Sequence, residues 1–191
     1  MEPLAETLTG ETLASHPAVV RFDERVELAL TDLRGNPVTD RIFYSLSTLA
    51  DFSLLWQLAA AARTLPERNG LRRYAVLAAG IATESLVVNQ GLKRLTRRRR
   101  PVLGLEHPFH VRATSTTSFP SGHASSAFFA ATVLASRHRS EAPAWFALAS
   151  LVAASRPYVG AHHPSDVAAG AAVGAALGGG WLLVMRRLGL D

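Results

Sequence analysis

The sequence predicts an all-α protein whose helices form a polytopic membrane bundle of about five to six helices. Its 191 residues suit one domain of ordinary size. Hydrophobic residues make up 48% of the chain, and they are gathered in blocks that charged clusters separate. No segment of useful length alternates apolar and polar residues with the period of a strand. We therefore expect helices throughout.

Five apolar blocks are candidates for membrane spans, because a spanning helix needs roughly 20 mostly apolar residues. The last block has nineteen residues without a charge, and the first two each contain one acid, Asp51 and Glu84. Each acid either has a function, or lies near the end of a span or pairs with a neighbouring arginine. The alternative fold is a soluble helical bundle. The blocks are Ile42–Ala62, Tyr74–Leu92, the segment from His123 to Ser136, Ala142–Ser155 and Val167–Met185.

Residues 1–191 are expected to form a single domain, with an amphipathic N-terminal segment (1–36) before the membrane helix bundle (42–187). Val19, Phe22 and Val26 recur near helical spacing, and the helix is expected to end at Gly35. This helix either lies on the bilayer surface or packs on the protein.

Charge and composition narrow the partners. The net charge of +5 suits an anionic partner such as a membrane surface, a phosphate or a nucleic acid. Cysteine is absent, so neither a disulfide framework nor a thiolate metal site is possible.

Three polar segments, Lys93–Pro101, Pro120–His123 and Ser155–Asp166, each lie at the end of an apolar block. The chain stays on one side of the membrane between the first and second segments. It then crosses with the third block and returns with the fourth, so the third segment emerges on the same side. Five spans therefore bring all three segments to one membrane face.

The residue types in these segments suit phosphate. Lys93, Arg100 and Arg156 are cations, and arginine binds phosphate oxygens bidentately. Ser121 and Gly122 come where the third block begins, and the N–H groups at a helix N-terminus attract anions.

Two histidines supply the chemistry. His162 and Asp166 are four residues apart, so a carboxylate in the first turn of the last helix can hold one ring nitrogen. The other nitrogen is then free to attack phosphorus. His123 is available as the acid that protonates the leaving oxygen.

The three segments together resemble the signature of the type 2 phosphatidic acid phosphatase superfamily. The patterns K-x-x-x-x-x-x-R-P, P-S-G-H and S-R-x-x-x-x-x-H-x-x-x-D match here at every fixed position. The resemblance implies no cofactor and no metal. It also implies a nucleophile (His162), a general acid (His123), an orienting carboxylate (Asp166), and phosphate ligands at Lys93, Arg100, Ser121, Gly122 and Arg156.

The resemblance implies an integral-membrane phosphatase of lipid phosphates or pyrophosphates in a bacterial cell membrane, acting through a phosphohistidine. Candidate substrates are polyprenyl (pyro)phosphate, decaprenyl-phosphate sugar phosphate, phosphatidylglycerol phosphate and phosphatidic acid. The alternatives are a vanadate-dependent haloperoxidase-like oxidoreductase, which the apolar blocks disfavour, and a non-enzymatic lipid-binding protein, which would not need two histidines. We expect the membrane and a lipid phosphate as partners, and no nucleic acid.

Two further patterns have structural interpretations. The run Arg97–Arg99 is interpreted as an anchor for anionic headgroups rather than as part of the phosphate site. Gly170, Gly174 and Gly178 are spaced four apart, which favours helix packing within the chain over a homodimer contact.

The distribution of arginines predicts an extracytoplasmic active site. Eight lie in the loops opposite the motifs and five on the motif side once the phosphate ligands are set aside, and positive charge favours the cytoplasm. The eight are Arg63, Arg68, Arg72, Arg73, Arg137, Arg139, Arg186 and Arg187, and the five are Arg94, Arg97, Arg98, Arg99 and Arg112.

Overall fold

A computed structural model describes residues 15–101 and 116–190, and this part of the chain is all-α, as predicted. Arg112 and the first fourteen residues of the N-terminal segment lie outside the described residues. The α-helices are α2 (Pro17–Thr31), α3 (Pro37–Leu49), α4 (Leu54–Thr64), α5 (Gly70–Leu86), α6 (Gly122–Arg137), α7 (Ala142–Tyr158) and α8 (Pro164–Arg187). These seven exceed the predicted five to six because the first apolar block is divided.

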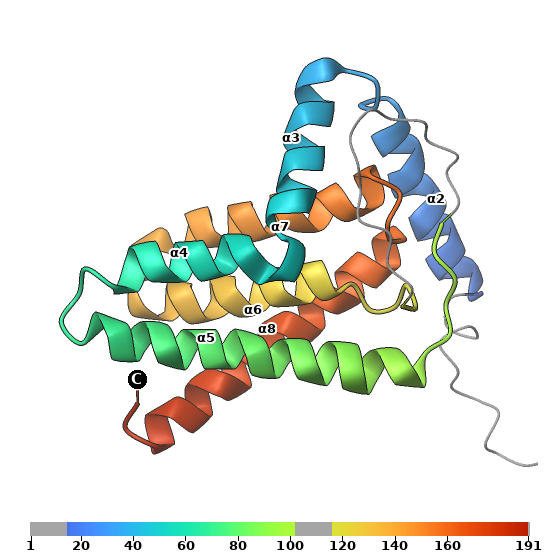
Figure 1. The fold of residues 1–191 in the computed structure, drawn as a ribbon. Coiled ribbons are helices and arrows are strands. Elements are labelled where there is room, and N and C mark those ends of the chain that lie inside the picture. Colours follow the sequence, from blue (N-terminus) through green and yellow to red (C-terminus); the bar gives the residue numbers. More distant parts are fainter. Residues whose placement is uncertain (1–14, 102–115, 191) are drawn as a thin grey trace, which may run out of the picture.

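The predicted continuous helix over 42–62 is wrong. A short 3-10 turn, Asp51–Ser53, interrupts it, and the backbone of Phe52 and Ser53 is left-handed, with φ of 54° and 58°. Left-handed residues cannot continue the hydrogen-bond ladder of a right-handed helix. Consequently α3 stands across the bundle while α4 lies along it (Figure 1), and Asp51 is placed at the bend.

Within the described residues, two helical runs are long and apolar enough to cross a membrane by length and composition. They are Gly70–Leu95, in which α5 continues through a π-helical turn and a 3-10 turn, and α8. Among the other predicted spans, α6 and α7 have 16 and 17 residues and are therefore about 24–26 Å long.

Helix α6 is the centre of the core and contacts α4, α5, α7 and α8. It is rich in alanine and serine, so its neighbours approach closely. A Cβ atom built on Gly170 or Gly174 of α8 would lie 2.4 or 2.0 Å from the backbone oxygen of Ser121 or Ser125. The glycine stripe is thus used for packing within the chain.

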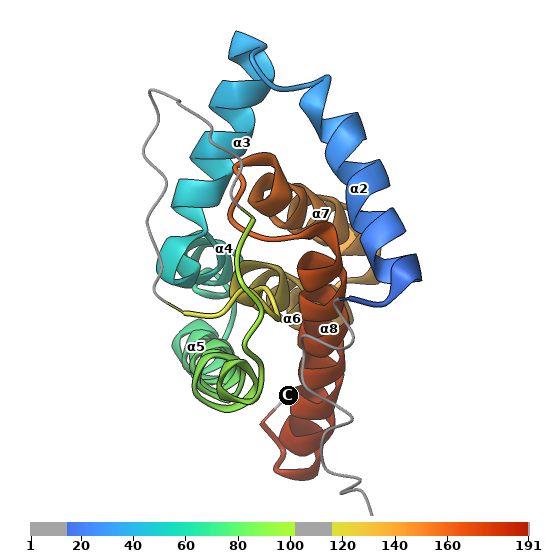
Figure 2. The same ribbon diagram turned by 90° about the vertical axis from the view of Figure 1, so that its right-hand side faces the viewer.

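Helix α2 packs on α7 and α8 at the motif end of the bundle (Figure 2). Its Asp23 is buried, whereas Val20, Phe22 and Leu28 are exposed. The helix therefore turns a polar side to the protein and leaves apolar side chains uncovered, which suits contact with a bilayer. The helix therefore packs on the protein, and its contact with a bilayer surface stays a prediction.

The three motif segments gather at one end of the bundle. The last turn of the helical run from α5, the start of α6 and the turn between α7 and α8 lie side by side there (Figures 1 and 2). The Ser121 N–H donates to the Asp166 backbone oxygen at 3.0 Å, which joins the second segment to the third.

Candidate active site

A cavity of about 360 Å³ lies among the three segments. Six of the eight predicted site residues line it, and the other two, Ser121 and Asp166, lie buried behind it. The six are Lys93, Arg100, Gly122, His123, Arg156 and His162.

His162 presents one ring nitrogen to a cation. Its Nε2 lies 3.2 Å from Nη1 of Arg100. Because arginine can only donate, Nε2 must be the accepting nitrogen with the free lone pair, and Nδ1 carries the hydrogen. Burial lowers the pKa of His162 to about 3, the Arg100 and Arg156 guanidiniums add to this effect, and Asp166 opposes it. The imidazole is therefore neutral at physiological pH.

Asp166 is fully buried and is held by three donors. The Arg98 guanidinium lies 2.6 Å from Oδ1, and the Ser118 hydroxyl and the His163 backbone N–H lie 2.5 and 2.9 Å from Oδ2. The His162 Nδ1 is 3.8 Å from Oδ2, close enough for electrostatic attraction but longer than a hydrogen bond. Asp166 thus lies on the Nδ1 side of the ring, opposite the lone pair, and its orienting role stays a prediction.

The ring of His123 contacts Asp51, an acid whose role could not be decided from the sequence. Its Nε2 lies 3.0 Å from Oδ1 of Asp51, at the bend between α3 and α4. The carboxylate orients this ring and offsets part of the cost of protonating it in a buried position, which suits a general acid. Glu84, the other acid whose role was undecided, accepts hydrogen bonds from Ser125 and Ser126 and so connects α5 to α6.

Three cations, Lys93, Arg100 and Arg156, line the cavity, and one of their N–H groups has no hydrogen-bond partner among the described residues. Lys93 and Arg156 are both buried, and an Arg156 Nη1 donates to the Ser47 hydroxyl. The Nε of Arg156 is buried and has no hydrogen-bond partner among the described residues. A buried donor without a partner is costly, so this group fits an anion that accepts from it.

The start of α6 completes the anion site. Ser121 is the N-cap residue of α6, and its hydroxyl accepts from the Ala124 N–H at 3.5 Å. A Cβ on Gly122 would lie 3.3 Å from Asn89 Oδ1 and 3.7 Å from Lys93 Nζ. The glycine therefore keeps open the space where backbone N–H groups of the first turn can meet a phosphate.

The interpretation of Arg98 as a surface anchor is wrong. Its side chain is only 9% exposed, and besides Asp166 it binds Asp23 Oδ2 at 2.7 Å and Ser165 Oγ at 2.7 Å. Arg97 and Arg99 are exposed, so the anchor interpretation remains a prediction for these two. Arg98 differs from its neighbours in the run only through its contacts with residues that are distant in the sequence.

The sequence analysis also missed Ser118, Asp23 and Ser47, whose contacts are described above. The described residues contain no group of three His, Cys, Asp or Glu side chains placed to hold a metal ion. Metal independence stays a prediction.

Comparison with known proteins identifies the family. The model of the PAP2 superfamily matches residues 73–189. The decaprenylphosphoryl-5-phosphoribose phosphatase of Mycobacterium tuberculosis is 36% identical over 158 residues, covering 80% of this chain and 82% of that protein. The protein of the same name from Mycolicibacterium smegmatis is 37% identical over 143 residues, covering 72% and 74%.

Two solved structures share the fold. The transmembrane PAP2-type phosphatidylglycerolphosphate phosphatase of Bacillus subtilis has a TM-score of 0.70 at 24% identity, covering 92% of this chain and 90% of that one. LpxE of Aquifex aeolicus has a TM-score of 0.66 at 24% identity, covering 92% and 99%. With the family model matching more than half of its length, the chain belongs to the PAP2 superfamily.

Proposed function

We propose that this membrane-embedded lipid phosphatase hydrolyses the phosphate monoester of a polyprenyl-phosphate sugar phosphate through a phosphohistidine at His162. The observation that carries the proposal is the cavity that the lone pair of His162 shares with His123 and three cations. The substrate class follows the names of relatives that align with most of the chain.

The first step forms a nitrogen–phosphorus bond. A bound phosphate accepts hydrogen bonds from the N–H groups of Arg100 and Arg156. The hydrogen bonds from Arg100 to phosphate compete with its contact to His162 Nε2. The freed lone pair attacks phosphorus as the bond to the sugar oxygen breaks. Positive charge develops on the imidazole, and the fixed carboxylate of Asp166 stabilises it.

The second histidine manages the protons. His123, in its protonated form and paired with Asp51, donates its proton to the departing sugar oxygen. The neutral His123 then takes a proton from a water whose oxygen attacks phosphorus, and the nitrogen–phosphorus bond breaks and returns its electron pair to His162. The products are the dephosphorylated lipid, inorganic phosphate, and a regenerated pair of histidines.

Two observations separate this function from its alternatives. A lipid-binding protein without catalysis has no need for two histidines that each pair with a carboxylate in one cavity. A vanadate-dependent oxidoreductase is not favoured, because the relatives that align with the chain are named phosphatases. Phosphate release that survives EDTA and is inhibited by vanadate would support a metal-independent phosphatase, whereas loss in EDTA restored by Mg²⁺ would contradict it.

A rapid-quench experiment with radiolabelled substrate tests the nucleophile. His162→Ala should trap no label, and His123→Ala should still trap it when the leaving group is good, because such a group needs no proton. The matched control is His163→Ala, which keeps the backbone N–H that binds Asp166 and should behave like the wild type. Phosphohistidine is acid-labile and base-stable, so acid-stable label, or label in His162→Ala, would refute the assignment.

We also propose that the active site faces away from the cytoplasm, on the arginine count. The chain has no cysteine, so single substitutions can report the side directly. Exposed Arg97 lies at the motif end and exposed Arg68 at the other. In intact cells, a membrane-impermeant maleimide should label Arg97→Cys and spare Arg68→Cys, and the reverse pattern would invert the topology.

A further inference from the structure

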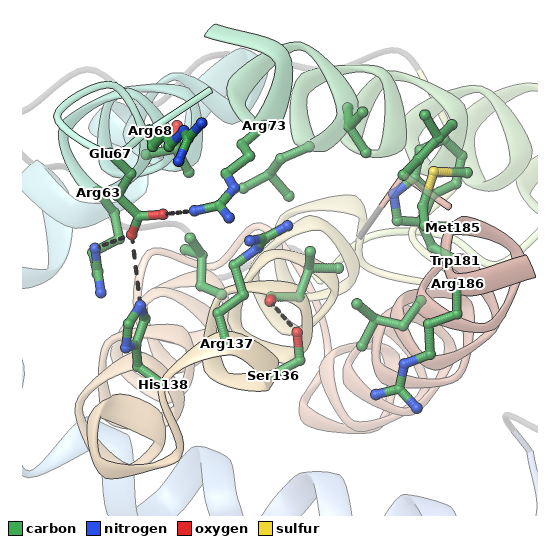
Figure 3. Close-up of a pocket in the computed structure, with 17 residues that line it drawn as sticks. Arg63, Glu67, Arg68, Arg73, Ser136, Arg137, His138, Trp181, Met185 and Arg186 are labelled. Carbon is green, nitrogen blue, oxygen red and sulfur yellow. Dashed lines mark hydrogen bonds and ion pairs between the residues drawn. The ribbon is translucent and has the colours of Figure 1, made fainter. Parts of the chain in front are cut away.

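A second and larger pocket, of about 690 Å³, lies at the end of the bundle opposite the catalytic cavity. The turn between α4 and α5, the start of α5, the end of α6 and the end of α8 surround it (Figure 3). Nothing in the proposed phosphatase mechanism uses this pocket.

The pocket has an apolar interior and a basic rim. Leu77 and Leu134 are buried side chains of the core, and Trp181 and Met185 of α8 continue the apolar surface. Of the described residues, five arginines and one acid, Glu67, line the same pocket. The arginines are Arg63, Arg68, Arg73, Arg137 and Arg186.

The acid does not balance the arginines. Glu67 binds Arg63 at 2.5 Å, also pairs with Arg73, and lies 3.5 Å from His138. Arg63 also binds Glu141, outside the pocket, at 3.0 Å. Arg68 and Arg186 form no ion pair within the described residues. Figure 3 also shows the guanidinium groups of Arg73 and Arg137 directed to the same space from α5 and α6. Arg68 and Arg186 therefore leave positive charge at the rim that a bound anion can balance.

The combination identifies the chemistry of the ligand. Arginine side chains bind phosphate oxygens bidentately, and basic pockets between membrane helices bind phosphate-containing headgroups. The apolar interior fits a hydrocarbon chain and gives no reason to bind a small free anion. The single histidine here, His138, contacts Glu67 and has no second histidine beside it, so binding rather than catalysis is expected.

We propose that this pocket binds an anionic phospholipid, with its phosphate on the arginine rim and the start of an acyl chain against Trp181. The site would lie at the membrane face opposite the active site. The bound phosphate would link the start of α5 to the ends of α6 and α8.

Tryptophan fluorescence of the full-length protein in detergent micelles tests the proposal. The probe is phosphatidylglycerol with brominated acyl chains, because bromine quenches nearby indole rings. Saturable quenching is expected, and it should disappear in Trp181→Phe, since Trp56 is fully buried in the core and Trp145 lies outside the pocket. Unchanged quenching in Trp181→Phe would place the lipid elsewhere and overturn the proposal.

Paired charge variants test the headgroup contact. Arg68→Gln/Arg186→Gln should weaken phosphatidylglycerol binding at least 10-fold. The control Arg139→Gln/Arg187→Gln removes the same charge from exposed positions near the same end, outside the pocket, and should change binding less than twofold. Equal losses in both pairs would indicate general attraction to the basic surface and would overturn the proposal.

Two competitors distinguish the sources of the phosphate. Brominated phosphatidylcholine should quench poorly, and inorganic phosphate at millimolar concentration should not displace phosphatidylglycerol. Equal binding of phosphatidylcholine would show an apolar groove that does not select anions, and displacement by inorganic phosphate would show a free-anion site. Either result refutes the proposal. Turnover of a water-soluble phosphate monoester by both charge variants reports their folding separately.

Discussion

Replacing Arg98 should damage catalysis although the residue is not in the cavity. Its guanidinium lies 2.6 Å from Asp166 Oδ1 and 2.7 Å from Asp23 Oδ2 and is almost completely buried. The substitution Arg98→Met keeps much of the length and removes the charge. Two buried carboxylates, from α2 and α8, then lose their shared cation.

The magnitude follows from the contacts. Removing one partner of a buried ion pair costs about 3–5 kcal/mol of stability, because a buried charge is left unpaired. A hydrogen bond to a charged group contributes about 1.5–3 kcal/mol, and Asp166 loses one of its three donors. If that loss is felt in the transition state, kcat falls by about 10- to 100-fold. KM should change little, since Arg98 does not line the cavity.

The assay is steady-state release of phosphate from a lipid phosphate in micelles, combined with thermal unfolding in the same detergent. Arg97→Met and Arg99→Met are the matched controls, because both side chains are exposed. Asp23→Asn should cost less activity than Arg98→Met, because Asp166 keeps its cation. Wild-type kcat in Arg98→Met, or an equal loss in the two controls, would refute the reasoning.

Three further predictions concern the cavity. Arg156→Lys should lose at least about 10-fold in kcat/KM, since a point charge cannot replace two guanidinium contacts, and near-normal turnover would remove Arg156 from the phosphate site. Asp51→Asn should slow monoester substrates about 10-fold and substrates with good leaving groups much less, because without the carboxylate a smaller fraction of His123 carries the proton that the leaving oxygen needs; equal slowing of both would contradict that role. In NMR of ring-labelled histidine, His162 should stay neutral at pH 5, and Arg100→Gln should raise its pKa from about 3, since Arg100 and burial both disfavour the proton; a charged ring at pH 5 would contradict this account.

The sequence predicts what local pattern and ordered motifs determine. The three motifs specify all eight site residues, and the structure places six of them around one cavity with the other two behind it. The apolar block 167–185 is sufficient to predict α8, because nineteen uncharged residues leave few alternatives to a long apolar helix.

What the sequence does not predict depends on contacts between distant segments. Arg97, Arg98 and Arg99 are identical as residues, and contacts with Asp23 and Asp166, 75 and 68 residues away, make the middle one structural. The helix break at Phe52 is not marked by a glycine or a proline. Left-handed backbone usually favours glycine, but here Phe52 and Ser53 adopt it, so the sequence gives no signal for the bend. The partner of His123 depends on this bend and therefore could not be predicted either.

The close packing of α8 on α6 sets the distance between the two halves of the active site, because His123 is on α6 and Asp166 is on α8. Gly170 permits this packing, since its Cβ in alanine would lie 2.4 Å from the Ser121 backbone oxygen, closer than real Cβ atoms come. Gly170→Ala must therefore move α8 relative to α6, and a displacement of about 1 Å can cost about 100-fold in rate. Gly179→Ala is the matched control, because nothing lies within 4 Å of its Cβ position, and alanine favours the helix by about 1 kcal/mol. Phosphate release by the folded Gly170→Ala protein should fall sharply while Gly179→Ala keeps its activity, and equal activity in the two would show that the histidines do not depend on this contact.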